Sequence, residues 1–398
     1  MNKRILILCE AIAPPAFSPR VITLIEWLQS NGWECVLITE ECAEHPFHTD
    51  ICVNYQMPVY THTLLDKLYW GKDKALYQFA KQKVDISSFE IIFCSSYYYF
   101  PLYAAHLLSQ EYRIPLAVDL RDIAEQWGDI CYFTRTITPF KKLDYWIGKL
   151  YERRQLRRRN QILHSANIVT TVSPWHKNVL AQYNENTHLF YNGYDANIFI
   201  PKDIVCDKFY ITYLGKLYST LLRDPRLLFE SLRQLYKEEL IDTKLVRVLF
   251  HTDVKGMEEI KCLGAQYQIS PMLEVNGYVP RQEILPIMHK SSILLVLTSK
   301  STPNGTHGIM GTKFFENIGV EKPILCVRSD EECLADTIAN THAGLAATNI
   351  EDVKTFILEK YQEWKTKGYT RQPVINKEQF TRQHEAKQFE QLFLQCIQ

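Results

Sequence analysis

A strand, loop, helix and strand in the second half of the chain constrain the fold more than any other feature. Residues 292–298 (SILLVLT) and 323–327 (PILCV) are short runs of branched apolar residues, which are typical of strands buried in a parallel sheet. Between them, residues 305–323 (GTHGIMGTKFFENIGVEKP) begin with glycines and continue with a helical period. Parallel strands need a crossover connection, usually a helix. The segment therefore predicts a βαβ unit.

The junction of loop and helix in this unit has the composition of an anion-binding site. A helix N-terminus presents unpaired backbone N–H groups and the positive end of the helix dipole. Lys313 adds a full charge there, and Glu316 lies within the first two turns, where its carboxylate could accept hydrogen bonds from two ribose hydroxyls. A structural interpretation remains open, because an early Glu often only complements the helix dipole and a Lys on a short helix is usually solvated.

The rest of the chain repeats the alternation of apolar runs and helical segments. In residues 1–191, strands are expected at 4–9, 34–39, 91–95, 115–119 and 168–172, which predicts a parallel α/β domain. A second alternation, at 209–375, predicts another domain of similar build. Residues 192–208 lack periodicity and are expected to be a linker. An apolar-periodic helix within 376–398 follows the last strand and is expected to pack back on the first domain.

Composition excludes several classes of protein. A chain of 398 residues is long enough for two domains, and its formal net charge of zero gives no reason to expect a nucleic-acid partner. The 11 cysteines are scattered and contain no C-x-x-C pair, which favours reduced thiols in a cytoplasmic protein. No apolar run approaches the length of a membrane span. Neither an Asp-x-Asp motif nor paired histidines indicate a metal site, and no cofactor is expected.

Several blocks of sequence, taken in order, resemble one known family. They are VDLRD at 118–122, ANIVTTVSPW at 166–175, YNGYD at 191–195, YLGKL at 213–217 and the loop and helix at 305–323. In this order and spacing they resemble the retaining glycosyltransferases of family 4 over nearly the whole chain. The resemblance implies the GT-B architecture, in which two Rossmann-like domains face each other across a deep cleft. It also implies a nucleoside-diphosphate sugar as donor.

The resemblance assigns roles to residues of the second domain. A basic pair after the glycine of YLGKL stabilises the departing diphosphate in the family, and here the pair is Lys216 and Arg223, after Gly215. Glu316 matches the residue that binds the ribose. The family commonly has an acidic residue eight positions earlier, where this chain has Gly308. The backbone here is expected to approach the diphosphate or the sugar instead, at Gly308, Gly311 and Thr312, with Lys313 compensating the charge.

Two further candidate groups lie in the first domain. Arg121 and Asp122 follow a buried strand, where relatives often have a histidine near the donor sugar. Arg121 is expected to reach the diphosphate and Asp122 to bind sugar or acceptor hydroxyls, although a structural salt bridge is the alternative. The loop at 13–20 corresponds to one that lies over the phosphates or against the acceptor in the family. Ser18 and Arg20 are its candidates, with Ser18 also expected to cap the following helix.

Residues 141–159 (KKLDYWIGKLYERRQLRRR) carry eight basic and two acidic residues. Apolar residues recur among them at spacings of three and four, which predicts an amphipathic helix. Such a helix suits an anionic membrane surface and would bring the protein to a polyprenyl-linked acceptor. A helix whose apolar side faces the core and whose basic side is solvated is the other interpretation.

The sequence as a whole predicts a cytoplasmic glycosyltransferase, peripheral at the inner face of the membrane if the basic helix binds lipid. It is expected to move a sugar from a nucleoside diphosphate to a glycan or lipid-linked acceptor, in the synthesis of surface polysaccharides or glycoconjugates, with retention and without a metal. Two alternatives remain open: a nucleotide-sugar 2-epimerase of the same fold, and a non-catalytic scaffold that binds a nucleotide sugar.

Overall fold

The computed structural model describes residues 3–10, 12, 18–41, 52–60, 69–128, 141–220, 222–300, 302–329 and 332–397. The chain divides into two compact units. Unit 1 comprises Met1–Asn192 and Arg382–Gln398, and unit 2 comprises Gly193–Thr381. Most of the expected linker, from Gly193 on, therefore belongs to unit 2. Within the described parts of the chain, no helix is both long and apolar enough to span a membrane.

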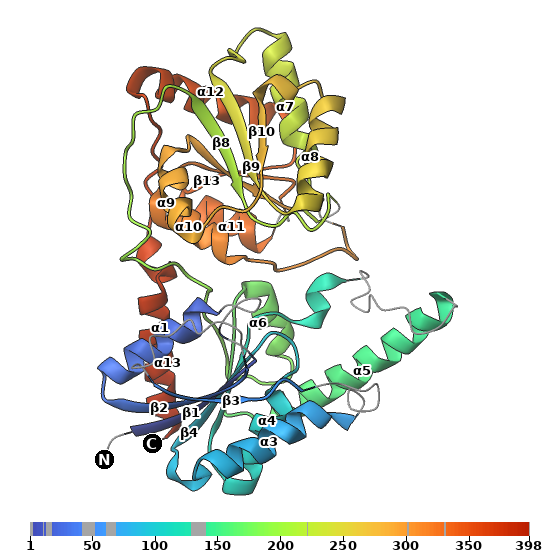
Figure 1. Ribbon diagram of the computed structural model, residues 1–398, viewed down its shortest axis with the longest axis vertical. Coiled ribbons are helices and arrows are strands. Elements are labelled where there is room, and N and C mark those ends of the chain that lie inside the picture. The colour runs from blue at the N-terminus through green and yellow to red at the C-terminus, as the bar shows by residue number, and fades with distance from the viewer. Residues whose placement is uncertain are drawn as a thin grey trace. The chain divides into compact units, whose positions relative to one another are not determined.

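Unit 1 is built on a parallel sheet of seven strands in the order β3-β2-β1-β4-β5-β6-β7 (Figure 1). The central strands are buried on both faces because helices cover both sides, as expected for a parallel sheet. The strands are β1 (Lys3–Cys9), β2 (Trp33–Glu40), β3 (Val53–Met57), β4 (Ile91–Ser96), β5 (Leu116–Leu120), β6 (Ile168–Thr171) and β7 (Thr187–Leu189).

Two apolar cores lie on the two faces of this sheet. One packs against α3 (Gly71–Lys83) and α4 (Leu102–Tyr112), and the other against α1 (Pro19–Ser30) and α13 (Arg382–Cys396). Phe389 and Phe393 of α13 pack on Phe93 of β4, with ring centroids 5.4 and 5.5 Å apart. The C-terminal helix is therefore part of the core of unit 1. The described part of unit 1 also contains α5 (Lys141–Ser165) and α6 (Pro174–Leu180).

Unit 2 has a parallel sheet of six strands in the order β10-β9-β8-β11-β12-β13. The strands are β8 (Phe209–Leu214), β9 (Val246–His251), β10 (Leu273–Asn276), β11 (Ile293–Leu297), β12 (Ile324–Val327) and β13 (Gly344–Ala347). The helices are α7 (Arg226–Lys237), α8 (Val254–Gln266), α9 (Arg281–Lys290), α10 (Thr312–Val320), α11 (Cys333–Thr341) and α12 (Ile350–Lys367). The expected fold class, with two parallel α/β domains, is confirmed.

A buried carboxylate ties together the middle of unit 1. Asp119 of β5 is fully buried and accepts hydrogen bonds of 2.8 Å from the hydroxyls of Ser95 on β4 and Thr170 on β6. Arg20 of α1 completes the cluster with an ion pair of 3.1 Å to Asp119 and a hydrogen bond to the carbonyl of Phe190. One carboxylate thus connects three strands to a helix, and its charge is balanced inside the core.

Glu385 of α13 lies next to this cluster. It accepts a hydrogen bond of 2.9 Å from the backbone N–H of Tyr191, and its other carboxyl oxygen, Oε2, is buried with no hydrogen-bond partner among the described residues. Burial raises the pKa of the Glu385 carboxyl to about 8, although the positive charge of Arg20 opposes the shift. The folded protein therefore holds a proton at Glu385 at neutral pH, whereas the unfolded chain does not.

We expect the free energy of unfolding to fall as the pH rises from about 4.5 to about 8, because folding then keeps a proton that the unfolded chain has released. Glu385→Gln keeps a side-chain oxygen that accepts the hydrogen bond from the Tyr191 N–H, and it removes the ionisable carboxyl group. The variant should be more stable than the parent by roughly 1–3 kcal/mol above pH 8 and nearly equal to it near pH 4. Urea unfolding across this pH range measures the difference.

The matched control is Glu378→Gln, which changes an exposed carboxyl. It should leave the pH profile of the parent intact. An equal pH profile for the parent and Glu385→Gln would show that Glu385 is ionised in the folded state.

Candidate functional site

The loop after β8 carries the first cation of the candidate site. The hydroxyl of Tyr213 donates a 2.9 Å hydrogen bond to the carbonyl of Lys216, and the backbone N–H of Leu217 donates to the hydroxyl of Thr252 at 3.1 Å. These bonds fix the backbone on both sides of the Lys216 side chain, which is exposed. The ammonium group lies 5.0 Å from the centre of the Tyr218 ring. Lys216 therefore extends into solvent from a firmly held loop.

The second cation, Arg223, is anchored to the neighbouring strand. Its Nη1 donates a 2.9 Å hydrogen bond to the carbonyl of Leu297, the last residue of β11. This bond uses one side of the planar guanidinium and orients the remaining N–H groups. The carboxyl ends of β8 and β11 adjoin in the sheet, so Lys216 and Arg223 come from the same edge.

The helix predicted from the loop at 305–323 is α10. It begins at Thr312, with Gly311 at the N-cap position, and Gly308 takes a left-handed φ of 65°, a conformation that favours glycine. Lys313 makes an ion pair of 2.8 Å with Glu316, one turn further on. Glu316 is largely buried, with a side-chain exposure of 11%, whereas that of Lys313 is 45%. The two residues are therefore directly coupled.

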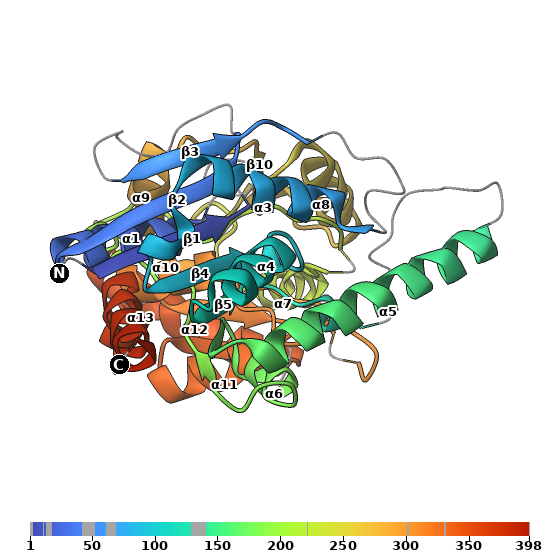
Figure 2. The same ribbon diagram turned by 90° about the horizontal axis from the view of Figure 1, so that it is seen from below.

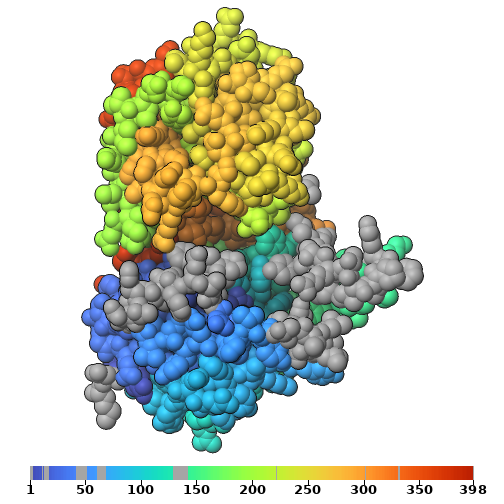
Figure 3. All heavy atoms as spheres, in the orientation of Figure 1, coloured from blue at the N-terminus to red at the C-terminus, as the bar shows by residue number. Residues whose placement is uncertain are grey.

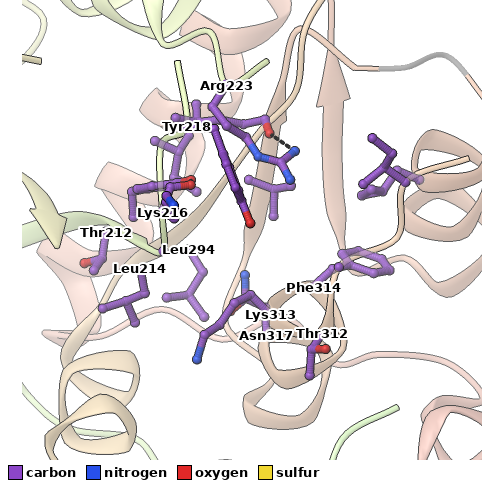
Figure 4. A pocket seen from close by; sticks show the side chains of 18 residues that line it. Thr212, Leu214, Lys216, Tyr218, Arg223, Leu294, Thr312, Lys313, Phe314 and Asn317 are labelled. Carbon is purple, nitrogen blue, oxygen red and sulfur yellow. Dashed lines mark hydrogen bonds between the residues drawn. The ribbon is translucent and has the colours of Figure 1, made fainter. Parts of the chain in front are cut away.

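These elements enclose a cavity of about 300 Å³ within unit 2 (Figure 4). Its walls come from β8, the loop after β8, β11 and the first turns of α10. Six of the residues predicted for the donor line it: Gly215, Lys216, Arg223, Gly311, Thr312 and Lys313. Gly308 and Glu316 are not among its lining residues. Glu316 is paired with Lys313, and Gly308 lies four positions before the first residue of the helix.

The cavity also has lining residues that the sequence did not indicate. Tyr218 projects between Lys216 and Arg223, with its hydroxyl toward Lys313 in Figure 4, and it has a left-handed φ of 61° that is unusual for an aromatic residue. Asn317, one turn of α10 beyond Lys313, is buried and also lines the cavity. A glycine would have indicated the left-handed turn at 218, but tyrosine gives no such signal. The spacing of four from Lys313 was the available signal for Asn317.

The arrangement is suited to a polyanion. Three basic side chains, two from the loop after β8 and one from the first turn of α10, reach one cavity at the carboxyl edge of a parallel sheet, where open α/β sheets bind ligands. The N-terminus of α10 supplies further N–H donors. The apolar wall formed by Leu294, Leu295 and Leu297 excludes water from one side, which strengthens the interaction of the cations with a bound charge.

Arg121 and Asp122 lie at the corresponding edge of the sheet in unit 1. Arg121 is 5% exposed and stacks on the ring of Tyr97 at 3.7 Å, while its Nε and Nη2 are buried and have no hydrogen-bond partner among the described residues. Asp122 accepts a 3.1 Å hydrogen bond from Gln126. Burial raises the pKa of Asp122 to about 6, with the Gln126 hydrogen bond and Arg121 opposing. No ion pair joins Arg121 to Asp122 in the described structure.

The two loop candidates, Ser18 and Arg20, need a correction. Arg20 points into the core and pairs with Asp119, so its charge is already used and it is not presented to a ligand. Ser18 stands at the N-cap position of α1, with Pro19 next, but its side chain makes no capping hydrogen bond and is buried. The sequence could not reveal the partner of Arg20, which is 99 positions away. Residues 13–17 of this loop lie outside the described residues.

The described residues contain no group of three or more His, Cys, Asp or Glu side chains that could hold a metal ion. The positively charged groups that line the cavity in unit 2 are the side chains of Lys216, Arg223 and Lys313.

The two parallel α/β units have the fold of the GT-B glycosyltransferases. Residues 19–198, somewhat less than half of the chain, match the model of Glycosyltransferase Family 4. For that part of the chain, the match agrees with the family resemblance expected from the sequence. No curated protein matches the sequence.

Solved structures share the fold over the full chain at low identity. A glycosyltransferase from Rickettsia africae superposes with a TM-score of 0.68 at 13% identity, covering 100% of this chain and 99% of its own. Anabaena HepE, solved with UDP and glucose, gives 0.64 at 14% identity, with 99% and 100% covered. A sucrose-phosphate synthase from Thermosynechococcus elongatus gives 0.65 at 14% identity, with 99% of each chain covered. At these identities the likeness concerns the fold.

Lys216→Ala should weaken the binding of nucleoside diphosphates by about 10-fold or more, since a charge-assisted contact contributes roughly 1.5–3 kcal/mol. The melting temperature without ligand should hardly change because the side chain is exposed. Calorimetric titration with UDP, GDP and ADP measures the binding, with the exposed Lys255→Ala on α8 as control. Unchanged affinity for every diphosphate that the parent binds would exclude Lys216 from the site.

Glu316→Gln separates a ribose contact from a structural role. If Glu316 binds the ribose, the variant should lose about 10-fold in affinity for the nucleoside diphosphate and nothing for inorganic pyrophosphate, which has no hydroxyls. The amide keeps the side-chain volume, and losing the pair with Lys313 leaves that cation available to phosphate. Parallel titrations with both ligands measure the two affinities. Equal losses for both would mean that Glu316 acts only by positioning Lys313.

Proposed function

We propose that this protein transfers a sugar from a nucleoside-diphosphate sugar to a hydroxyl of a glycan or lipid-linked acceptor, with retention of the anomeric configuration. The observation that carries the proposal is the convergence of Lys216, Arg223 and Lys313 on one cavity at the N-terminus of α10. The fold adds support, since HepE, which shares it, was solved with UDP and glucose.

The proposed chemistry uses the cavity to hold the leaving group. As the bond between the anomeric carbon and the phosphate oxygen breaks, negative charge grows on the diphosphate, so the three cations stabilise the transition state more than the bound donor. The acceptor oxygen then bonds to the same face of the anomeric carbon, and its proton passes to the departing phosphate oxygen. Side-chain cations supply the positive charge in this scheme, and no metal is required.

Arg121 and Asp122 of unit 1 are candidate substrate-binding residues in this proposal. Arg121 holds two buried N–H positions without an acceptor among the described residues, which suits a phosphate or another anionic oxygen. Asp122, with its pKa raised to about 6 by burial, is largely ionised at neutral pH and accepts hydrogen bonds from sugar or acceptor hydroxyls. A buried, unsatisfied guanidinium is costly for folding alone, and this cost supports a role in binding.

We place the reaction in the cytoplasm and in the synthesis of surface glycans or glycoconjugates. The nine described cysteines form no disulfide with one another, as expected of a reducing compartment. Two alternatives to transfer would use the same nucleotide-sugar site. One is epimerisation at carbon 2 of the donor sugar, and the other is binding of the nucleotide sugar without any reaction.

One experiment tests the proposal and separates the three activities. The protein is incubated with UDP-, GDP- and ADP-sugars, with and without polyprenyl-linked glycan acceptors, and products are followed by mass spectrometry and by NMR of the anomeric proton. We expect transfer with retention from one donor, slow hydrolysis without acceptor, and loss of at least about 100-fold in turnover for Arg223→Ala. Epimerised donor, an inverted product, or binding without turnover would each contradict the proposal.

A further inference from the structure

The helix α5 carries an exposed stripe that no part of the proposed reaction uses. Leu143, Trp146 and Leu150 have exposed fractions of 48%, 62% and 63%. Their spacing of three and four places them on one face, and the same face continues through Arg153 and Arg157, which are also exposed. The stripe is thus apolar in its first two turns and basic in the next two, over about 20 Å.

The C-terminal half of the helix is firmly attached to unit 1. Arg159 is buried and makes a bidentate pair with Glu125 at 2.7 and 2.6 Å. Arg158 lies between the rings of Trp70 and Tyr103, at 3.4 and 3.8 Å from their centres. These contacts hold the helix as a rigid arm. In Figure 2 its N-terminal half extends away from the sheet of unit 1, and Figure 3 shows its atoms, in green, at the surface of that unit.

This packing limits the interpretation of α5 as a helix whose apolar side faces the core to its C-terminal half, where Ile162 and Leu163 are buried in the core of unit 1. The apolar residues Leu143, Trp146 and Leu150 of its N-terminal half are in solvent. An exposed Trp and Leu pair is unfavourable in water and is typical of a surface that meets a partner.

The charges on the helix indicate what that partner is. Lys142, Arg153, Arg154 and Arg157 are exposed and form no ion pair within the described structure. Of the two acidic residues, Glu152 is paired with Lys149 at 3.1 Å and Asp144 is buried. We propose that the stripe from Leu143 to Arg157 docks on an anionic phospholipid surface, with Trp146 and Leu150 in the interfacial layer and the arginines among the headgroups.

A second copy of the chain fits this stripe less well. In a two-fold dimer the stripe would meet itself. Parallel helices would then place arginines against arginines, and antiparallel helices would place arginines against Trp146 and Leu150. An anionic bilayer satisfies both halves at once, since it offers an apolar interior next to negative headgroups. The inference goes beyond the proposed function, because lipid binding requires no donor and no turnover.

The test is cosedimentation of the full chain with vesicles of phosphatidylcholine, alone or mixed equally with phosphatidylglycerol. We expect binding to the anionic vesicles only, weakening as salt rises. Arg153→Glu with Arg157→Glu should reduce it at least about 25-fold, from roughly five-fold for each charge near the surface. Trp146→Glu with Leu150→Glu should abolish it although the arginines remain.

The matched control is Val254→Glu with Lys261→Glu, which changes an exposed apolar and an exposed basic residue of α8 in unit 2. It should bind vesicles like the parent. Circular dichroism and UDP titration of each variant show whether it folds and keeps its donor site, so failure here is distinct from failure of the proposed function. Equal binding by all variants, no binding by the parent, or a dimer abolished by Trp146→Glu with Leu150→Glu would overturn the inference.

Discussion

All strands within each sheet run in the same direction, and most other features of the molecule follow from this constraint. Parallel strands end at one edge, so the residues that follow them gather there whatever their distance in sequence. In unit 2 this brings Lys216, after β8, next to the Leu297 carbonyl that holds Arg223 at the end of β11. In unit 1 it places Arg121 and Asp122 at the end of β5. Cations collected in this way require an anionic ligand or a buried partner.

Asp119 and Arg121, two residues apart in the sequence, are both buried charges, but only Asp119 has partners for its charge within the described structure. The carboxylate of Asp119 is neutralised by Arg20 and by two hydroxyls, and it stabilises the sheet. Arg121 has an aromatic ring beneath it but lacks acceptors for two of its N–H positions among the described residues. The first arrangement is complete without a ligand, and the second is not.

The sequence was sufficient to predict the parallel α/β class, the central strands and the helix that carries Gly311, Thr312 and Lys313, because apolar runs and a glycine-led helix are local signals. The family resemblance indicated the other three predicted lining residues, Gly215, Lys216 and Arg223. It failed where the cause was not local. The half-buried strands β3 and β13 carry polar or small residues and have no apolar run. Arg20 was predicted to be available to a substrate because its actual partner, Asp119, is remote in sequence. Tyr218 was missed because a tyrosine does not signal a left-handed turn. For α5, periodicity gave the helix but not the face that packs.

The chain passes from unit 1 to unit 2 at Asn192 and returns at Thr381, so unit 2 is inserted within the sequence of unit 1. Phe389 and Phe393, which complete one face of the first sheet, are thus synthesised only after the whole of unit 2. That face of the first sheet remains incompletely covered, by α1 without α13, while some 190 residues of the second unit are made and can fold by themselves. Synthesis order and assembly order therefore differ in this protein: the unit begun first is the unit finished last.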